Sequence, residues 1–152
     1  VETIKRNFDF YEPYTVHESS ISASTHSIVA STIGNKQKAY ELYLRTARLD
    51  LDDYNNEVAE GLHITSMAGT WLAIVQGFGG MRVKNDKLHF NPHIPEKWNA
   101  FAFNILFRGN QLNIRVEKDR TIIHNIKGGT LELYLNNQLV EVLAESQREI
   151  KN

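Results

Sequence analysis

Hydrophobic residues recur at helical spacing in the first 80 residues of the chain and at every second position afterwards. The first pattern predicts helices over residues 21–33, 37–48 and 65–77. Gly34 and Asn35 fit the end of one helix and the N-cap of the next. The last helix has the most regular apolar stripe, formed by Ile64, Met67, Ala68, Trp71, Leu72, Val75 and Phe78.

The alternation after residue 80 predicts five or six short β-strands. It is strongest over residues 101–107, and Arg108-Gly109-Asn110 is typical of a hairpin turn. Asn85-Asp86, Gly128-Gly129 and Asn136-Asn137 separate the other apolar runs. Short strands at this spacing favour a β-sandwich of the jelly-roll kind. Helices first and strands second indicate a segregated α+β fold with two domains, residues 1–80 and 81–152.

Composition and charge exclude several function classes. The net charge is −1, which gives no electrostatic reason to expect a nucleic-acid or membrane-surface partner, and no apolar run approaches a membrane span. The chain has no cysteine, which excludes thiolate chemistry and is compatible with the cytoplasm. The spacing of His89, His93 and His124 is not that of a metal site, so we expect no metal.

The first candidate site is the polar segment that leads into the helix at residue 21. Ser19 or Ser20 could simply cap that helix, with His17 and Glu18 solvated near its positive end. The alternative is an anion site, because the N–H groups at a helix start also hold anions. Spacing alone leaves both interpretations open.

The second candidate site has the same form and precedes the helix at residue 65. It contains His63, Thr65 and Ser66, and helix capping is again the simpler interpretation. The two junctions could face each other across a pocket, although composition does not show that they do. The acidic residues at 50, 52 and 53 lack the pattern of a calcium loop and are interpreted as a solvated connector.

Several long strings of unusual composition follow one another along the chain. They cover residues 7–13, 15–20, 39–52, 60–69, 76–81 and 91–98. In this order they closely resemble the C-terminal part of glycoside hydrolase family 65, which includes the maltose, trehalose and kojibiose phosphorylases. After about residue 110 only the strand pattern continues the resemblance.

The resemblance implies a fold and a reaction. Residues up to about 80 would be the last helices of an (α/α)₆ barrel, and a jelly-roll-like β-sandwich would follow. A Glu general acid, in a barrel segment outside this chain, protonates the glycosidic oxygen, while phosphate attacks from the opposite face and gives β-glucose 1-phosphate. In hydrolytic members a Glu base activates water instead, which is the inverting two-carboxylate scheme. Missing barrel helices would leave Ile28, Leu42 and Trp71 partly uncovered.

The resemblance also assigns roles to residues of this chain. Glu18 matches the base of the hydrolytic members, and Ser19, Ser20 and His63 match the region that contacts phosphate. Thr65 and Ser66 are expected as neighbours of that region. An ionised Glu18 would repel a phosphate dianion, so it needs a proton or a cationic neighbour.

These observations lead to one main hypothesis and two alternatives. We expect a fragment, inactive alone, of a cytoplasmic, homodimeric α-glucoside phosphorylase that acts on maltose, with inorganic phosphate as co-substrate and no cofactor. The chain begins with Val1 rather than Met, which fits a fragment or a processed protein. The alternatives are an inverting α-glucosidase of the same family and a noncatalytic carbohydrate-binding or interaction module.

Overall fold

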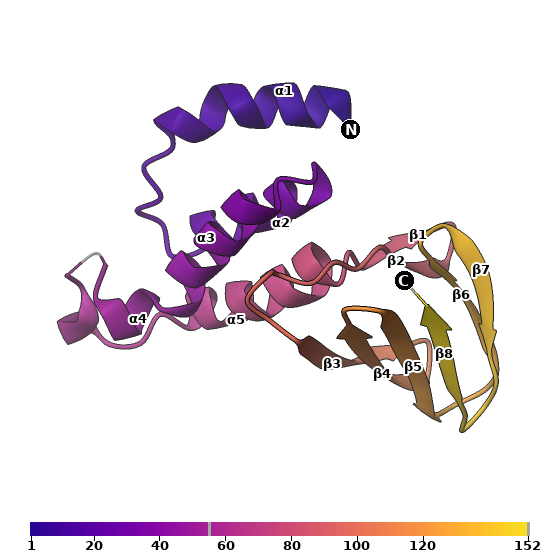
Figure 1. Ribbon diagram of the computed structural model, residues 1–152. Helices are drawn as coiled ribbons and strands as arrows, with labels where there is room; N and C mark the ends of the chain where they lie inside the picture. Colours follow the sequence, from indigo (N-terminus) through magenta and orange to yellow (C-terminus); the bar gives the residue numbers. More distant parts are fainter. Residues whose placement is uncertain (55, 152) are drawn as a thin grey trace. The chain divides into compact units, whose positions relative to one another are not determined.

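The computed structural model describes residues 1–54 and 56–151, which divide into two compact units (Figure 1). The helical unit is Val1–Phe78 and the β unit is Gly79–Asn152. Helices followed by strands confirm the segregated α+β fold. Among the described residues, no helix has the length and apolar character needed to cross a membrane.

The helical unit contains the three predicted helices and several short elements that the hydrophobic pattern does not reveal. The 3₁₀ helices are η1 and η2, and η3 is a π-helical continuation of α5. The bounds are α1 (Glu2–Tyr11), η1 (Glu12–Tyr14), α2 (Ser22–Thr32), α3 (Lys36–Ala47), α4 (Leu49–Asp52), η2 (Val58–Glu60), α5 (Ile64–Leu72) and η3 (Ala73–Phe78). The Asn35 side chain caps α3 as predicted, by accepting a hydrogen bond from the Lys38 N–H.

Helices α2, α3 and α5 pack through small residues. The buried positions of α2 are Ala23, Ser24, Ser27 and Ala30. The Ser27 hydroxyl donates to the Ala39 carbonyl of α3 at 2.7 Å, and Gly69 of α5 lies directly against Ser24. Small side chains allow such close approach of helix backbones. Because α2 and α5 pack closely against each other, their N-terminal ends are also held close together.

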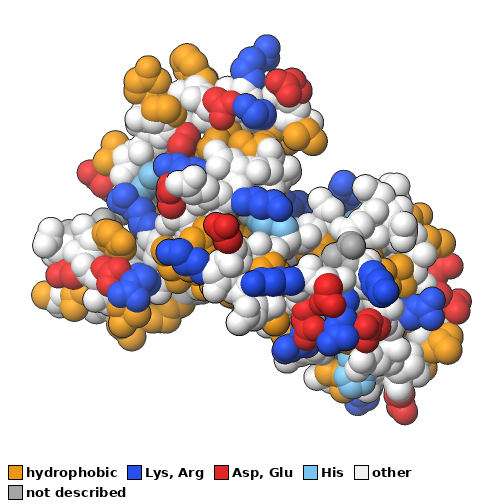
Figure 2. Space-filling view, viewed as in Figure 1, with side chains coloured by type: hydrophobic (Ala, Val, Ile, Leu, Met, Phe, Trp, Pro, Cys, Tyr) orange, Lys and Arg blue, Asp and Glu red, His pale blue; other side chains and the backbone are white. Residues whose placement is uncertain are grey.

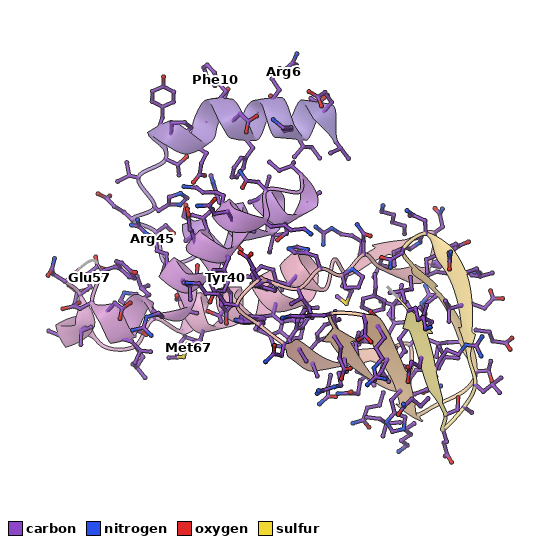
Figure 3. The ribbon with its side chains drawn as sticks, in the orientation of Figure 1. Arg6, Phe10, Tyr40, Arg45, Glu57 and Met67 are labelled. Carbon is purple, nitrogen blue, oxygen red and sulfur yellow. The ribbon has the colours of Figure 1, made fainter. Side chains whose placement is uncertain are left out.

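The predicted apolar stripe of the last helix is buried only at its end, at Val75 and Phe78 of η3; within α5 it is not the buried face. Ile64, Met67 and Trp71 are 68%, 46% and 47% exposed, whereas Ser66 and Gly69 are buried. The reason is that the small-residue face packs on α2 and α3. Figures 2 and 3 show apolar side chains at the surface around α4 and α5, with Met67 pointing away from α1. Trp71 is thus partly uncovered as expected, but Leu42 is buried.

The β unit consists of two four-stranded sheets. The first has the order β1 (Arg82–Lys84), β2 (Lys87–Phe90), β6 (Leu131–Leu135), β7 (Gln138–Val142). The second has the order β3 (Ala100–Phe107), β4 (Asn110–Glu117), β5 (Arg120–Lys127), β8 (Gln147–Lys151). Only the pairing of β2 with β6 is parallel among the described strands. Alternate residues are buried in β2, β4, β5, β6 and β7. Phe90 and Phe103 join the two sheets, with ring centroids 6.3 Å apart.

The turns of the β unit confirm the predictions made from Gly and Asn. Both central residues are left-handed in the turns at Asn85-Asp86, Arg108-Gly109 and Asn136-Asn137, as a type I′ hairpin requires. Strand β8 was not predicted because its residues are mostly polar and exposed; it is recognisable only from its pairing with β5.

Candidate functional site

Three of the candidate residues lie on the loop of residues 15–20, which precedes α2. Helix α2 has Ile21 at its N-cap, and no side chain of the described residues caps it. Capping by Ser19 or Ser20 is therefore a wrong prediction, although the Ser19 carbonyl accepts the Ser22 N–H at 3.0 Å. Glu18 and Ser19 are exposed, and Ser20 is half-buried.

The structure brings the two candidate junctions together. The Ser20 and Thr65 hydroxyl oxygens are 2.5 Å apart, although the residues are 45 positions apart in the sequence. Within the described part of the chain, α5 also begins without a side-chain cap. Two helix starts, with their N–H groups and two hydroxyls, thus lie side by side, an arrangement that suits an anion.

Ser66 is separated from the other candidates. It is 2% exposed, and its hydroxyl donates to the Thr46 carbonyl of α3 at 2.7 Å. In the described structure this side chain takes part in helix packing, and a place for Ser66 beside phosphate stays a prediction.

His63 is held at the start of α5 by two carboxylates. Its Nδ1 is 2.5 Å from Asp50 Oδ1, its backbone N–H donates to Asp50 Oδ2 at 3.1 Å, and its Nε2 is 3.3 Å from Glu57 Oε2. The interpretation of Asp50 as a solvated connector is therefore wrong, because its side chain is only 17% exposed. The backbone contact explains how this acidic segment fixes the beginning of α5.

The carboxylates favour the protonated form of His63. The hydrogen bond from Asp50 raises the pKa of His63; burial opposes this, and the charges of Asp50 and Glu57 add to the increase. The same hydrogen bond, against some burial, lowers the pKa of Asp50. The stabilisation from His63 is complete below the ordinary imidazole pKa of about 6.5 and is lost as the pH rises through the raised pKa. That from Asp50 is lost as the pH falls through its lowered pKa. At the start of α5, His63 thus holds its proton more tightly than a free imidazole does.

Replacing Asp50 with asparagine is expected to lower the pKa of His63 toward its ordinary value. Asparagine keeps one acceptor for the backbone N–H but has no negative charge to stabilise the imidazolium. An NMR titration of the His63 ring protons measures this, with Asp53→Asn as the control on the same segment. An unchanged His63 pKa in Asp50→Asn would show that Asp50 does not set the charge of His63.

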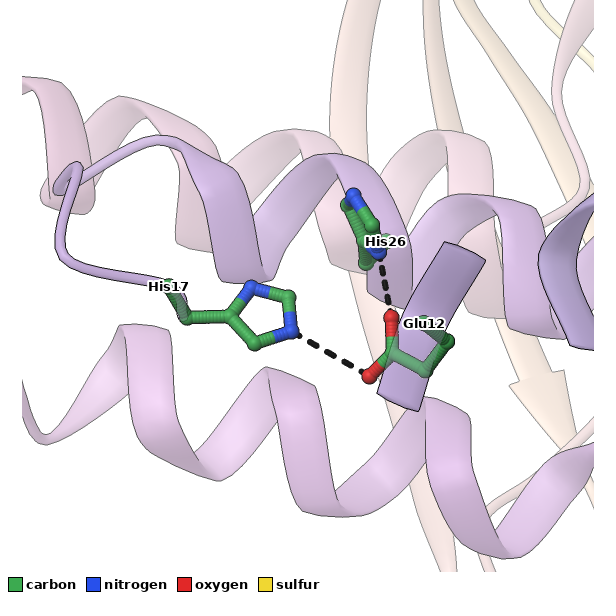
Figure 4. Close-up of side chains that lie close together, drawn as sticks. All are labelled: Glu12, His17 and His26. Carbon is green, nitrogen blue, oxygen red and sulfur yellow. Dashed lines mark hydrogen bonds and ion pairs between the residues drawn. The ribbon is translucent and has the colours of Figure 1, made fainter. Parts of the chain in front are cut away.

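A second polar cluster, formed by Glu12, His17 and His26, was not found from the sequence (Figure 4). Glu12 accepts from His17 Nε2 at 3.2 Å and from His26 Nδ1, and the side chains of Glu12 and His17 are only 9% and 7% exposed. The expectation of a solvated His17 is wrong. The contacts bridge 5 and 14 positions of sequence and depend on the fold, so no spacing rule indicates them.

The side chains of this cluster are of the kinds that bind metal ions. Their charges, however, fit a cluster held together by hydrogen bonds and an ion pair. Lys38 Nζ lies 3.1 Å from Glu12 Oε1, so a cation already occupies the carboxylate. Burial favours a raised pKa at Glu12, but hydrogen bonds from its imidazole neighbours and Lys38 outweigh it and leave the pKa lowered. Burial lowers the pKa of His17, which Glu12 only partly offsets. A carboxylate that is paired with Lys38 and hydrogen-bonded by two imidazoles accounts for the contacts of this cluster.

The described structure contains a groove of about 530 Å³ that holds none of the candidate residues. Its lining comes entirely from residues 138–150 of β7, β8 and their connection, and includes Leu139, Val142 and Ile150. The lining has no aromatic side chain on which a sugar ring could stack. The convergence of helix starts in the helical unit is therefore the better candidate.

Comparisons with known proteins agree with the two-part organisation. The family model described as "Glycosyl hydrolase family 65 central catalytic domain" matches residues 1–72, and "Glycosyl hydrolase family 65, C-terminal domain" matches residues 81–142. The chain is 48% identical to a maltose phosphorylase of Bacillus subtilis (strain 168) over 152 residues, which cover 100% of the chain and 20% of that protein.

Two further relatives carry the names of other phosphorylases. An alpha,alpha-trehalose phosphorylase of Thermoanaerobacter brockii is 46% identical over 133 residues, covering 88% of the chain and 17% of that protein. A solved structure titled "Putative kojibiose phosphorylase from human microbiome" is similar with a TM-score of 0.91 and 42% identity, over 98% of the chain and 22% of that structure. The chain spans about a fifth of the length of these curated relatives.

Proposed function

Because the chain belongs to glycosyl hydrolase family 65, we propose that it supplies the phosphate-binding side of the active site of an inverting α-glucoside phosphorylase. Phosphate would attack the anomeric carbon and release β-glucose 1-phosphate, while a general acid outside this chain protonates the leaving sugar. The chain alone is then inactive. Residues 1–80 would complete the catalytic barrel, and residues 81–152 would form the linker and the C-terminal sandwich.

The observation that carries this proposal is the contact between Ser20 and Thr65. It places the starts of α2 and α5 side by side, and each supplies a hydroxyl and backbone N–H groups. His63, at the N-cap of α5, adds a cation whose pKa Asp50 raises. Backbone donors, hydroxyls and a positive charge are the groups that bind a phosphate dianion.

The carboxylate of Glu57 has a specific place in this proposal. It lies against His63 Nε2 and is 42% exposed. An incoming phosphate oxygen can therefore take the place of the Glu57 carboxylate as the acceptor for His63 Nε2. Ser19 and Glu18 lie on the exposed part of the 15–20 loop. Glu18 would be the base-equivalent residue, and the cationic His63 would reduce its repulsion of phosphate.

Maltose is the disaccharide that we propose as substrate. The maltose phosphorylase of Bacillus subtilis is 48% identical to the chain, whereas a kojibiose phosphorylase of Escherichia coli (strain K12) is 34% identical. The trehalose phosphorylase at 46% identity makes trehalose the competing substrate.

The complete protein encoded by the gene is expected to cleave maltose only when inorganic phosphate is present. The assay measures β-glucose 1-phosphate and free glucose with maltose, trehalose and kojibiose, each with and without phosphate. Phosphate-independent release of two sugars would instead identify the hydrolase. No cleavage of any α-glucoside, with sugar binding retained, would support the binding module.

A further inference from the structure

We propose that His17, fixed by Glu12, is the positioning residue that holds the 15–20 loop in its phosphate-binding conformation. The inference rests on the proposed function, because it concerns the geometry of the same site. His17 itself lies one residue before Glu18 and would not touch the phosphate.

The backbone of His17 adopts a conformation that must be held by its surroundings. Its φ is +58°, in the left-handed region that side-chain-bearing residues seldom occupy. The Arg45 guanidinium of α3 donates to the His17 carbonyl at 3.1 Å. The loop therefore turns sharply at His17, and the direction of the turn decides where Ser19 and Ser20 lie.

Both ring nitrogens of His17 are engaged. An ionised Glu12 only accepts, so His17 Nε2 carries the proton and donates to it at 3.2 Å. Nδ1 is then the acceptor for the Ser22 hydroxyl at 2.9 Å. The imidazole thus connects Glu12, the first residue of η1, to Ser22, the first residue of α2, across the 15–20 loop.

The Glu12 carboxylate is itself held in place by other residues, so it can fix the position of His17. It is bonded to His26 of α2 and to Lys38 of α3 as well as to His17, and it is almost completely buried. Because two packed helices hold this carboxylate, the hydrogen bond from His17 Nε2 to it fixes the position of the His17 ring. The loop is thereby fixed to α2, whose start meets the start of α5 at Ser20 and Thr65, and to α3.

His26 offers a matched control, because its imidazole bonds to the same carboxylate but lies within α2 and not on the loop. A purely structural role for the cluster predicts similar consequences for the loss of either imidazole. A positioning role for His17 predicts that its loss changes the phosphate site more than the loss of His26 does.

In the complete enzyme, His17→Ala is expected to raise KM for phosphate about tenfold, because misplacement of binding groups by less than 1 Å carries penalties of this size. KM for maltose should change less than about twofold. His26→Ala removes one helix contact of Glu12 but leaves that with Lys38, so it should raise KM for phosphate by less than His17→Ala does. His17→Gln, which can donate to Glu12 and accept from Ser22, should restore part of the phosphate affinity. If His17→Ala does not fold, Arg45→Met releases the His17 carbonyl and should raise KM for phosphate in the same direction.

Equal effects of His17→Ala and His26→Ala on KM for phosphate would overturn the inference, as would equal increases of both Michaelis constants. These outcomes are distinct from a failure of the proposed function, which would appear already in the unmodified enzyme as cleavage without phosphate or no cleavage.

Discussion

His63→Ala in the complete enzyme is expected to raise KM for phosphate about ten- to a hundredfold while KM for maltose changes little. The loss removes a hydrogen bond from a charged donor to a charged ligand, and such bonds are worth about this factor in affinity. Asp50 and Glu57 raise the pKa of His63 and so favour the protonated form, which is the stronger donor. Initial rates with each substrate varied in turn separate the two Michaelis constants.

The control is His124→Ala, which removes an imidazole from β5 in the β unit. It should leave both Michaelis constants unchanged. If His63→Ala has unchanged phosphate kinetics, then His63 is only the residue that begins α5 and its pairing with Asp50 is structural. A pH profile adds a test of sign: phosphate affinity should fall as the pH rises through the raised pKa of His63.

The helices and strands that could be predicted are those whose formation depends on neighbouring residues in the sequence. Helices α2 and α3 and the helix formed by α5 and η3 follow from period and from Gly34-Asn35, and the hairpins follow from residues that tolerate positive φ. Strand β8 has no apolar alternation, and α1 buries only Phe8. Strand β8 therefore carries no hydrophobic signal. Helix α1 does have an amphipathic sequence, with Ile4 and Phe8 four positions apart, but it was not predicted.

The faces of the helices could not be predicted, because periodicity shows that a helix is amphipathic but not what covers its stripe. In α5 the described residues cover the small-residue face and leave Ile64, Met67 and Trp71 exposed. The chain spans about a fifth of the length of its relatives. The resemblance to the last helices of a barrel is the reason to expect that further helices cover these exposed residues. Serines and glycines, which hydrophobicity patterns ignore, decide how α5 packs.

The sequence could predict some of the residues of the candidate site but not the tertiary contacts that hold them in place. The polar composition of the two junctions pointed to Ser20, His63 and Thr65, and the structure brings Ser20 to Thr65. It also showed Ser66 to be buried. The supporting residues Glu12, His17 and Asp50 act through tertiary contacts over 5 to 14 positions, which no local rule describes.

Gly69→Val is expected to destabilise the packing of α5 on α2 by about 1–3 kcal/mol, the usual cost of inserting atoms into a packed core. A Cβ at Gly69 would lie 2.5 Å from the Ser24 Oγ and 2.8 Å from its Cβ, which is closer than real side chains approach. The Ser24 hydroxyl can rotate only by giving up its hydrogen bond to the Ile21 carbonyl. The small gain in helix propensity on replacing glycine does not offset this cost.

The same substitution should weaken phosphate binding, although Gly69 is not one of the proposed ligands. Moving α5 away from α2 separates Thr65 from Ser20, whose oxygens are 2.5 Å apart in the packed structure. Hydrogen exchange of the α2 and α5 amides measures the local destabilisation, and steady-state kinetics of the complete enzyme measure KM for phosphate. Gly129→Val, at a position where an added Cβ meets nothing within 4 Å, is the control for adding a side chain. Faster exchange in Gly69→Val with unchanged phosphate affinity would mean that the convergence of the two helix starts is not what binds phosphate.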